Sequence, residues 1–246
     1  MGWPRAVVFD LDGTLIDSGP DLARLLNKVL AEHGRSAVDP IRVRGFVGDG
    51  VAKLVERGFA ATGSADIDTC RIATSRFLDC YEAEPAALTL PYPGVVATLT
   101  RLRDEGRRLA VCTNKAERVT HAVLRVLGLD GFFDAVIGGD TLAARKPDPA
   151  PLRAAIERLG VGPDEAIMVG DNEHDAATAR AAGIPCVLVT YGYARAPLAS
   201  LAAAATIDSF EDLGAALARL AAARRIDVDG RAPGTYTDGG TPGSGA

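Results

Sequence analysis

The sequence has few of the residues that build disulfide frameworks, zinc sites or membrane spans. Its four cysteines include no Cys-x-x-Cys pair and its three histidines are scattered, so zinc-ligand spacing is absent. No apolar run approaches the length of a membrane span. The first apolar run, Val7-Val8-Phe9, starts too close to the first residue to leave room for a signal peptide. We therefore expect reduced thiols, no membrane partner and a cytoplasmic location.

Excess positive charge is also missing. The net charge of -5 argues against nucleic acid or an anionic membrane surface as a partner. Lysine is scarce, because only four of the 27 basic residues are lysines: Lys28, Lys53, Lys115 and Lys146. A small anionic substrate would need a local cation. The lysines are candidates because an ammonium is a compact point charge.

The chain length and the pattern of apolar runs indicate the fold class. A chain of 246 residues suits one large domain, or one domain that carries a smaller insertion. From about residue 90, short apolar runs alternate with helical patterns, which is typical of a parallel sheet covered on both faces. Buried strands are predicted at residues 5–9, 109–112, 135–137, 166–169 and 186–189. Helices are predicted at residues 93–106, 116–127, 149–159, 174–182 and 209–224.

The stretch between the first two strands interrupts this alternation. It contains no convincing strand, and its apolar periodicity predicts helices at residues 20–32, from 40, at 51–60 and at 66–84. The predicted fold is therefore α/β, with a Rossmann-like parallel sheet core at residues 1–16 and 88–226 and an inserted all-helical domain at 17–87. Residues 227–246 are rich in Gly, Thr, Asp and Pro, and we expect a disordered tail there.

Two carboxylates follow the first strand. Asp10 and Asp12 are two residues apart, so in an extended chain both side chains point to the same side. Two like charges at this spacing are costly without a cation, and carboxylate oxygens suit Mg²⁺. Gly13 allows a tight turn that offers backbone N–H groups to an anion. Taken alone, the segment is equally well explained as a strand that ends in a solvated Asp-Gly turn.

Further polar residues follow the other predicted strands. They are Thr113 and Asn114 after the second strand, Lys146 after the third, and Asp171 and Asp175 after the fourth. Ligands of open parallel sheets bind beyond the carboxyl ends of the strands, so we expect these side chains to converge with Asp10 and Asp12. Carboxylates, a hydroxyl and a lysine together would serve Mg²⁺-assisted phosphoryl transfer.

The order of these residues resembles the haloacid dehalogenase-like hydrolases. The four motifs of that family match Asp10–Thr14, Thr113, Lys146 with Pro147, and Gly170-Asp171 with Asp175. The resemblance implies that Asp10 is the nucleophile and becomes an aspartyl phosphate, and that Asp12 serves as acid and then as base.

The same resemblance implies the metal and phosphate ligands. Mg²⁺ would be held by Asp10, the backbone carbonyl of Asp12 and Asp171, with Asp175 in support. Lys146 and Thr113 would bind the phosphate oxygens, with Gly13 and Asn114 close to the phosphate or the leaving group. His174 lies within the last motif, where we expect an exposed helix-start histidine and no metal ligand.

The inserted helices resemble the cap of this family, where substrate choice is expected. Phe46–Gly50 and Thr113-Asn114-Lys115 resemble phosphoglycolate phosphatases, which implies a small phosphate ester, 2-phosphoglycolate, as substrate of a monomer or homodimer. The alternatives are a β-phosphoglucomutase-like phosphomutase, a phosphatase for sugar phosphates or pyrophosphate, a 2-haloacid dehalogenase and a non-catalytic binding protein. Candidates for binding a substrate carboxylate are Arg44, Lys53, Arg57 and Lys115, although an ordinary solvated charge is the commoner role for each.

Overall fold

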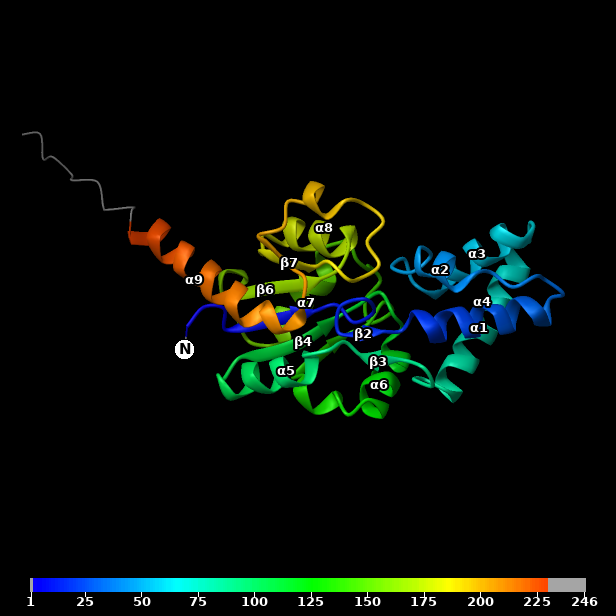
Figure 1. Ribbon diagram of the computed structural model, residues 1–246, viewed down its shortest axis with the longest axis horizontal. Coiled ribbons are helices and arrows are strands. Elements are labelled where there is room, and N and C mark those ends of the chain that lie inside the picture. The colour runs from blue at the N-terminus through cyan, green and yellow to red at the C-terminus, as the bar shows by residue number, and fades with distance from the viewer. Residues whose placement is uncertain (1, 230–246) are drawn as a thin grey trace, which may run out of the picture.

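The computed structural model describes residues 2–229 of the chain. A sheet covered by helices lies at the centre, and a second group of helices, α1–α4, lies beyond one end of the strands (Figure 1). Among residues 2–229, every helix is too short or too polar to span a bilayer. Most of the tail expected at 227–246 lies outside the described residues. Its first part differs from the expectation, because residues 227–229 belong to helix α9.

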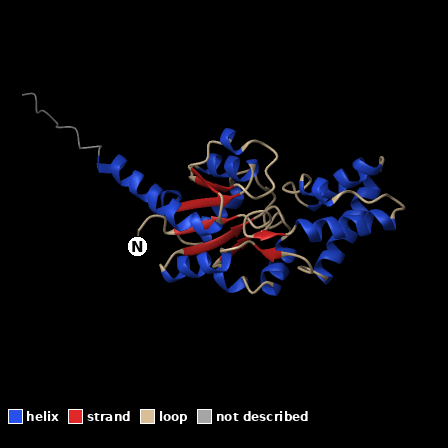
Figure 2. Cartoon of the chain, in the orientation of Figure 1, coloured by secondary structure: helices blue, strands red, loops and turns tan. Residues whose placement is uncertain are grey.

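The central sheet has six strands in the order β5-β4-β1-β6-β7-β8, and every neighbouring pair is parallel (Figure 2). The strands are β1 (Ala6–Phe9), β4 (Arg108–Cys112), β5 (Ala135–Ile137), β6 (Ala166–Gly170), β7 (Cys186–Val189) and β8 (Ala205–Ile207). The predicted α/β fold with a parallel sheet is confirmed. Phe9 pairs with Val111 on one side and Val169 on the other, so the ends of β1, β4 and β6 lie level.

Helices cover both faces of this sheet because its strands are apolar on both sides. Val7 and Phe9 of β1 face a core shared with α5 (Val95–Asp104), α6 (Glu117–Val126) and α9 (Leu213–Asp229). Ala6 and Val8 face the opposite core, which α7 (Ala150–Arg158) and α8 (Glu173–Ala182) cover. Short 3₁₀ turns occur at Asp130–Phe132, Pro163–Glu165, Leu198–Ser200 and Phe210–Asp212.

The segment between β1 and β4 is largely helical. It contains α1 (Gly19–Glu32), α2 (Pro40–Arg44), α3 (Val51–Thr62) and α4 (Ile67–Ala83). The side chains of Asp39 and Asp66 accept backbone N–H groups at the starts of α2 and α4, so the capping residues fix where these helices begin. A short antiparallel pair, β2 (Ile16–Asp17) and β3 (Leu90–Pro91), joins the two ends of the segment.

Four elements of the fold differ from the sequence prediction. The strands β2, β3 and β8 were not predicted, because Asp, Pro and Thr interrupt the apolar residues of their segments, unlike the continuous run at 135–137. The last helix starts at Leu213 and follows a 3₁₀ turn, whereas the prediction began it at residue 209. These short elements exist because they pair or pack against distant parts of the chain.

Asp21 on α1 holds the returning chain in place. Its fully buried carboxylate accepts hydrogen bonds from the backbone N–H groups of Leu88 and Thr89, both at 2.8 Å, and from the Thr89 hydroxyl at 2.7 Å. Burial alone would raise the pKa of Asp21, but these hydrogen bonds and Arg24 hold it below its ordinary value. The carboxylate therefore holds residues 88–89, where the chain returns from the helical segment to the sheet, against α1.

We expect Asp21→Ala to lower the free energy of unfolding by about 2–4 kcal/mol, because it leaves buried donors without an acceptor. The loss should be largest above pH of about 4, the unfolded carboxyl pKa, and should shrink as the pH falls through the lower folded pKa. Urea unfolding at several pH values measures this. The control Asp68→Ala removes an exposed carboxylate on α4 and should change stability by less than about 0.5 kcal/mol. Equal effects of the two substitutions would contradict the role of Asp21.

Candidate active site

Polar side chains gather where β1, β4 and β6 end. Asp10 directly follows β1, Thr113 follows β4 and Asp171 follows β6. Because these strand ends lie level in the sheet, the three residues reach one volume from different segments. The loop after β5 brings Lys146 to the same place, and α8 brings Asp175.

Lys146 is at the centre of this group. Its Nζ lies 2.8 Å from Asp10 Oδ1 and 2.7 Å from Asp175 Oδ1, and all three side chains are buried. Burial alone would lower the pKa of Lys146, but the carboxylates of Asp10 and Asp175 raise it above its ordinary value. The lysine is therefore a permanent buried cation that orients Asp10.

The carboxylates around Lys146 outnumber its single positive charge. One oxygen each from Asp10, Asp171 and Asp175 lie within 4.8 Å of one another. Burial, with the nearby charges of Asp175 and Asp12, raises the pKa of Asp10 to about 6, against the opposing effect of Lys146. Burial, Asp175 and Asp10 also raise the pKa of Asp171. Three buried carboxylates and one ammonium form an oxygen-rich group in which negative charge is in excess, and such a group fits a hard divalent cation.

Asp175 and Asp171 have different surroundings within the acidic group. Asp175 Oδ2 accepts the backbone N–H groups of Asp171, at 3.0 Å, and of Asn172, at 3.2 Å, so Asp175 shapes the loop after β6. The side chain of Asn172 also caps α8 and donates to Asp171 Oδ1 at 2.7 Å. The backbone N–H of Tyr193 donates to Asp171 Oδ2 at 2.6 Å. These contacts hold the Asp171 carboxylate toward Asp10.

Two glycines make the close approach of these carboxylates possible. A Cβ at Gly13 would overlap Asp171 Oδ2, and the φ of +89° at Gly13 is unfavourable for other residues. A Cβ at Gly170 would overlap the carboxyl group of Asp175. The glycines of the two motifs are therefore needed for close packing of the acidic side chains.

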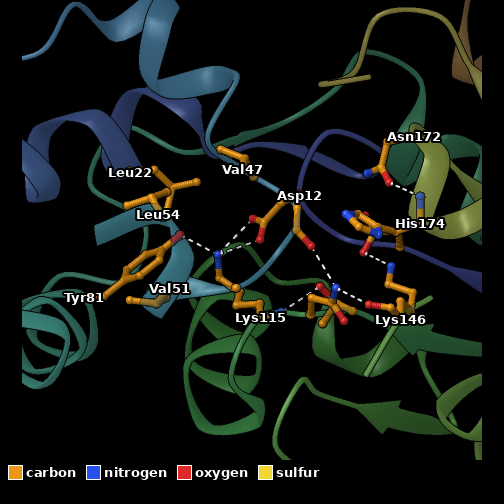
Figure 3. Close-up of a pocket in the computed structure, with 15 residues that line it drawn as sticks. Asp12, Leu22, Val47, Val51, Leu54, Tyr81, Lys115, Lys146, Asn172 and His174 are labelled. Carbon is orange, nitrogen blue, oxygen red and sulfur yellow. Dashed lines mark hydrogen bonds and ion pairs between the residues drawn. The ribbon is translucent and has the colours of Figure 1, made fainter. Parts of the chain in front are cut away.

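Asp12 points to a different partner. Lys115 Nζ lies 2.9 Å from Asp12 Oδ1 and 3.0 Å from Asp12 Oδ2, and it donates to the Tyr81 hydroxyl oxygen at 2.6 Å (Figure 3). The Lys115 side chain is only 3% exposed, so its interpretation as an ordinary solvated charge was wrong. Burial alone would lower the pKa of Lys115, but Asp12 and Tyr81 raise it. The side chain of Asp12 is thus separated from the acidic group around Lys146.

Thr113 and Asn114 lie between the two lysines. The Thr113 hydroxyl accepts the backbone N–H of Lys115 at 3.2 Å, and no hydrogen bond found within residues 2–229 uses that hydroxyl as a donor. Asn114 Nδ2 donates to the carbonyls of Gly48, at 2.8 Å, and Lys146, at 3.0 Å. Its buried Oδ1 finds no partner in the described part of the chain. The amide of Asn114 therefore ties the α1–α4 segment to the sheet, a role that the sequence did not reveal.

A cavity lies between the strand ends and the α1–α4 segment (Figure 3). Polar residues line one side and apolar residues the other. The lining comprises Asp10, Asp12, Leu22, Val47, Gly48, Gly50, Val51, Leu54, Tyr81, Thr113, Asn114, Lys115, Lys146, Asn172 and His174. Arg44, Lys53 and Arg57 are absent from this lining and pair with Asp17, Glu56 and Asp49. Among the four candidate cations for a substrate carboxylate, Lys115 alone reaches the cavity.

The sequence of this chain is similar to a known family of hydrolases and to a phosphatase of similar length. The haloacid dehalogenase-like hydrolase family matches residues 7–189 of this chain. A phosphoglycolate phosphatase of Rhodospirillum rubrum is 50% identical over 216 residues, which cover 86% of this chain and 90% of that protein.

Two solved structures are similar to this chain in fold. A predicted phosphoglycolate phosphatase from Haemophilus somnus has a TM-score of 0.82 and 30% identity, over 86% of this chain and 96% of that one. CbbY from Rhodobacter sphaeroides, in complex with xylulose-1,5-bisphosphate, has a TM-score of 0.72 and 28% identity, over 88% and 99%.

A charged network joins the α1–α4 segment to the sheet beside the cavity. Asp49, in the loop before α3, lies 2.8 Å from His174 Nε2, 2.7 Å from Arg195 Nη1 and 2.6 Å from Arg57 Nη2. Burial alone would raise the pKa of Asp49, but Arg195 and Arg57 lower it to about 2. His174 starts α8 as expected, but its side chain is largely covered by this contact and is not exposed.

We expect Asp49→Ala to loosen this junction, because it removes one carboxylate that contacts Arg57, Arg195 and His174. Backbone amides of residues 45–50 should exchange hydrogen about 5–30-fold faster, which corresponds to about 1–2 kcal/mol of local stability. Hydrogen exchange followed by mass spectrometry measures this. Glu56→Ala is the control, because Glu56 pairs with Lys53 on α3 and makes no such junction. If both variants exchange as the wild type does, Asp49 does not hold the segment in place.

Proposed function

The chain belongs to the haloacid dehalogenase-like hydrolases and is a phosphatase. We propose that it hydrolyses 2-phosphoglycolate to glycolate and phosphate, and that an aspartyl phosphate is the intermediate. The observation that carries the proposal is the division of the two carboxylates after β1. The Asp10 carboxylate is held by Lys146 within the acidic group, whereas the Asp12 carboxylate is paired with Lys115. One carboxylate is thus placed for attack and the other for proton transfer.

The first step transfers the phosphoryl group to Asp10. A carboxylate oxygen of Asp10 attacks phosphorus, and the bond between phosphorus and the ester oxygen breaks. Asp12 gives a proton to that oxygen, so glycolate leaves as an alcohol. Lys146 and the Thr113 hydroxyl stabilise the charge on the phosphoryl oxygens. The backbone N–H of Gly13, which was expected to contact the phosphate, donates instead to the Ile16 carbonyl at 2.9 Å.

The second step releases phosphate from Asp10. Asp12, now unprotonated, takes a proton from a water molecule, and the water oxygen attacks phosphorus. The bond between phosphorus and the Asp10 oxygen breaks, which restores the Asp10 carboxylate. The same carboxyl group of Asp12 therefore acts as acid in one step and as base in the next.

Mg²⁺ fits this site and would be held by Asp10, the backbone carbonyl of Asp12 and Asp171, with Asp175 in support. The acidic group lacks the positive charge to balance three buried carboxylates, and its ligands are all oxygens. When bound, the ion would neutralise charge on the phosphoryl oxygens. The network around Asp175 and Asn172 would hold the Asp171 ligand in place.

We propose that residues 17–87 act as a cap domain on a catalytic core formed by 1–16 and 88–226. Gly48 and Tyr81 contribute to the cavity from this segment, and the Asp49 network and the Asn114 amide close its edge. A segment that covers the site excludes water from the first step and selects the leaving group.

A phosphatase for sugar phosphates is the second candidate. The structure of CbbY with a bound bisphosphate favours it, because that protein shares this fold. A phosphomutase would use the same phosphoryl-Asp10 but return the group to a sugar. The 2-haloacid dehalogenase reaction is the weakest alternative, since it has no use for the proton carried by Asp12.

Steady-state kinetics on a panel of phosphate esters tests the proposed substrate. With Mg²⁺, kcat/KM should be highest for 2-phosphoglycolate, ahead of sugar phosphates, sugar bisphosphates and pyrophosphate. Asp10→Asn should reduce kcat by a factor on the order of 10⁶, as expected for loss of a nucleophile, with little change in melting temperature. A sugar phosphate at the top of the panel would favour the second candidate, and an active Asp10→Asn would remove Asp10 as nucleophile.

Removal of divalent metal should abolish activity, and Mg²⁺ should restore it. Asp171→Asn should raise the Mg²⁺ concentration needed for half-maximal activity about 10–100-fold, because it removes a charged ligand. Titration with Mg²⁺ of enzyme from which a chelator has removed divalent metal measures both effects. Asp164→Asn, an exposed carboxylate far from the site, is the control and should leave the titration unchanged. Full activity in excess chelator would contradict the metal assignment.

A further inference from the structure

Lys115 is a buried cation that the two steps above do not use. Its neighbours in the cavity wall are the Asp12 carboxylate and the Tyr81 hydroxyl, and its Nζ lies 4.3 Å from the centre of the Tyr81 ring. Tyr81 belongs to α4, so this contact crosses from the sheet to the helical segment. Lys115 is paired with Asp12, and the phosphoryl group already has Lys146, so a second anionic group of a ligand that reached this wall would compete with Asp12 for the Lys115 ammonium.

The ion pair occupies both oxygens of Asp12. Lys115 Nζ is 2.9 Å from Oδ1 and 3.0 Å from Oδ2, so without a ligand the ammonium is shared by both carboxylate oxygens. Asp12 must face the ester oxygen to transfer a proton to it. A ligand group that draws Lys115 away would free Asp12 for that contact.

The remaining wall around Lys115 is apolar. Leu22, Val51 and Leu54 lie beside Tyr81 and Lys115 in the part of the cavity that faces the helices (Figure 3). An anion that enters this region loses its hydration and needs a buried partner, and Lys115 is the one lysine there.

We propose that Lys115 is the specificity-determining residue, which binds the carboxylate of the substrate and in doing so releases Asp12 toward the ester oxygen. The inference rests on the proposed function and assigns the residue that selects the leaving group. In 2-phosphoglycolate a single methylene carbon separates the ester oxygen from the carboxylate. A cation that touches Asp12 is therefore within reach of that carboxylate when Asp12 faces the ester oxygen. Tyr81 stays in contact with Lys115 and holds it beside the leaving group.

The test compares two esters that differ only in the proposed ligand group. Ethyl phosphate has a methyl group where 2-phosphoglycolate has its carboxylate. The wild type should prefer 2-phosphoglycolate in kcat/KM by at least about 100-fold, as expected for a buried charge pair. Lys115→Met should reduce that preference to within about tenfold, mainly through a higher KM for 2-phosphoglycolate.

Two further variants guard against an effect on folding. Lys28→Met replaces an exposed lysine on α1 and should keep the wild-type preference. Lys115→Gln keeps a hydrogen-bond donor for Asp12 and Tyr81 but cannot pair with a carboxylate as a charge. It should lose the preference as Lys115→Met does, and it replaces Lys115→Met if that variant fails to fold.

The outcomes separate this inference from the proposed function. If the wild type prefers 2-phosphoglycolate but the Lys115 variants lose activity on both esters equally, the substrate stands and the role of Lys115 is wrong. If the Lys115 variants keep the full preference, the carboxylate binds elsewhere. If the wild type shows no preference over ethyl phosphate, the proposed substrate and the role of Lys115 both fail.

Discussion

The site depends on one buried ion cluster, in which the Lys146 ammonium contacts the carboxylates of both Asp10 and Asp175. The cluster requires three segments to meet: the end of β1, the loop after β5 and the start of α8. Burial raises the pKa of Asp10 and Asp171, and the neighbouring carboxylates add to this because Lys146 balances only part of their charge. The three carboxylates offer oxygen ligands to a divalent cation. The parallel sheet holds these groups together because the ends of β1, β4 and β6 lie level.

The sequence was sufficient to predict the residues that carry strong local signals. Buried strands and the polar residues that follow them were readable, because apolar runs and Asp-Gly turns are local features. The strands β2, β3 and β8 were missed because they exist only through pairing with distant chain. The burial of Lys115 and the contacts of Asn114 and Asp49 were missed for the same reason. Their partners, which include Tyr81, Gly48 and Arg195, lie far away in the sequence.

The helical segment and the sheet meet through polar contacts that also shape the site. Tyr81 reaches Lys115, the carbonyl of Gly48 accepts the Asn114 amide, and Asp49 pairs with residues at the start of α8 and in the loop after β7. The chemistry of phosphoryl transfer would thus belong to the sheet, and recognition of the leaving group to contacts shared with the helices. Such a division would allow one family to act on several phosphate esters with the same carboxylates.

In the proposed mechanism, Asp10 carries the phosphoryl group between the two steps. Rapid acid quench of a single turnover detects that group directly. Wild-type enzyme in excess over 2-phosphoglycolate is quenched at millisecond intervals and then digested. The mass of the peptide that contains Asp10 is measured by mass spectrometry. We predict that this peptide gains and then loses the mass of one phosphoryl group as glycolate and then phosphate appear. Release of phosphate in step with glycolate, with no phosphorylated peptide at any quench time, would contradict the account.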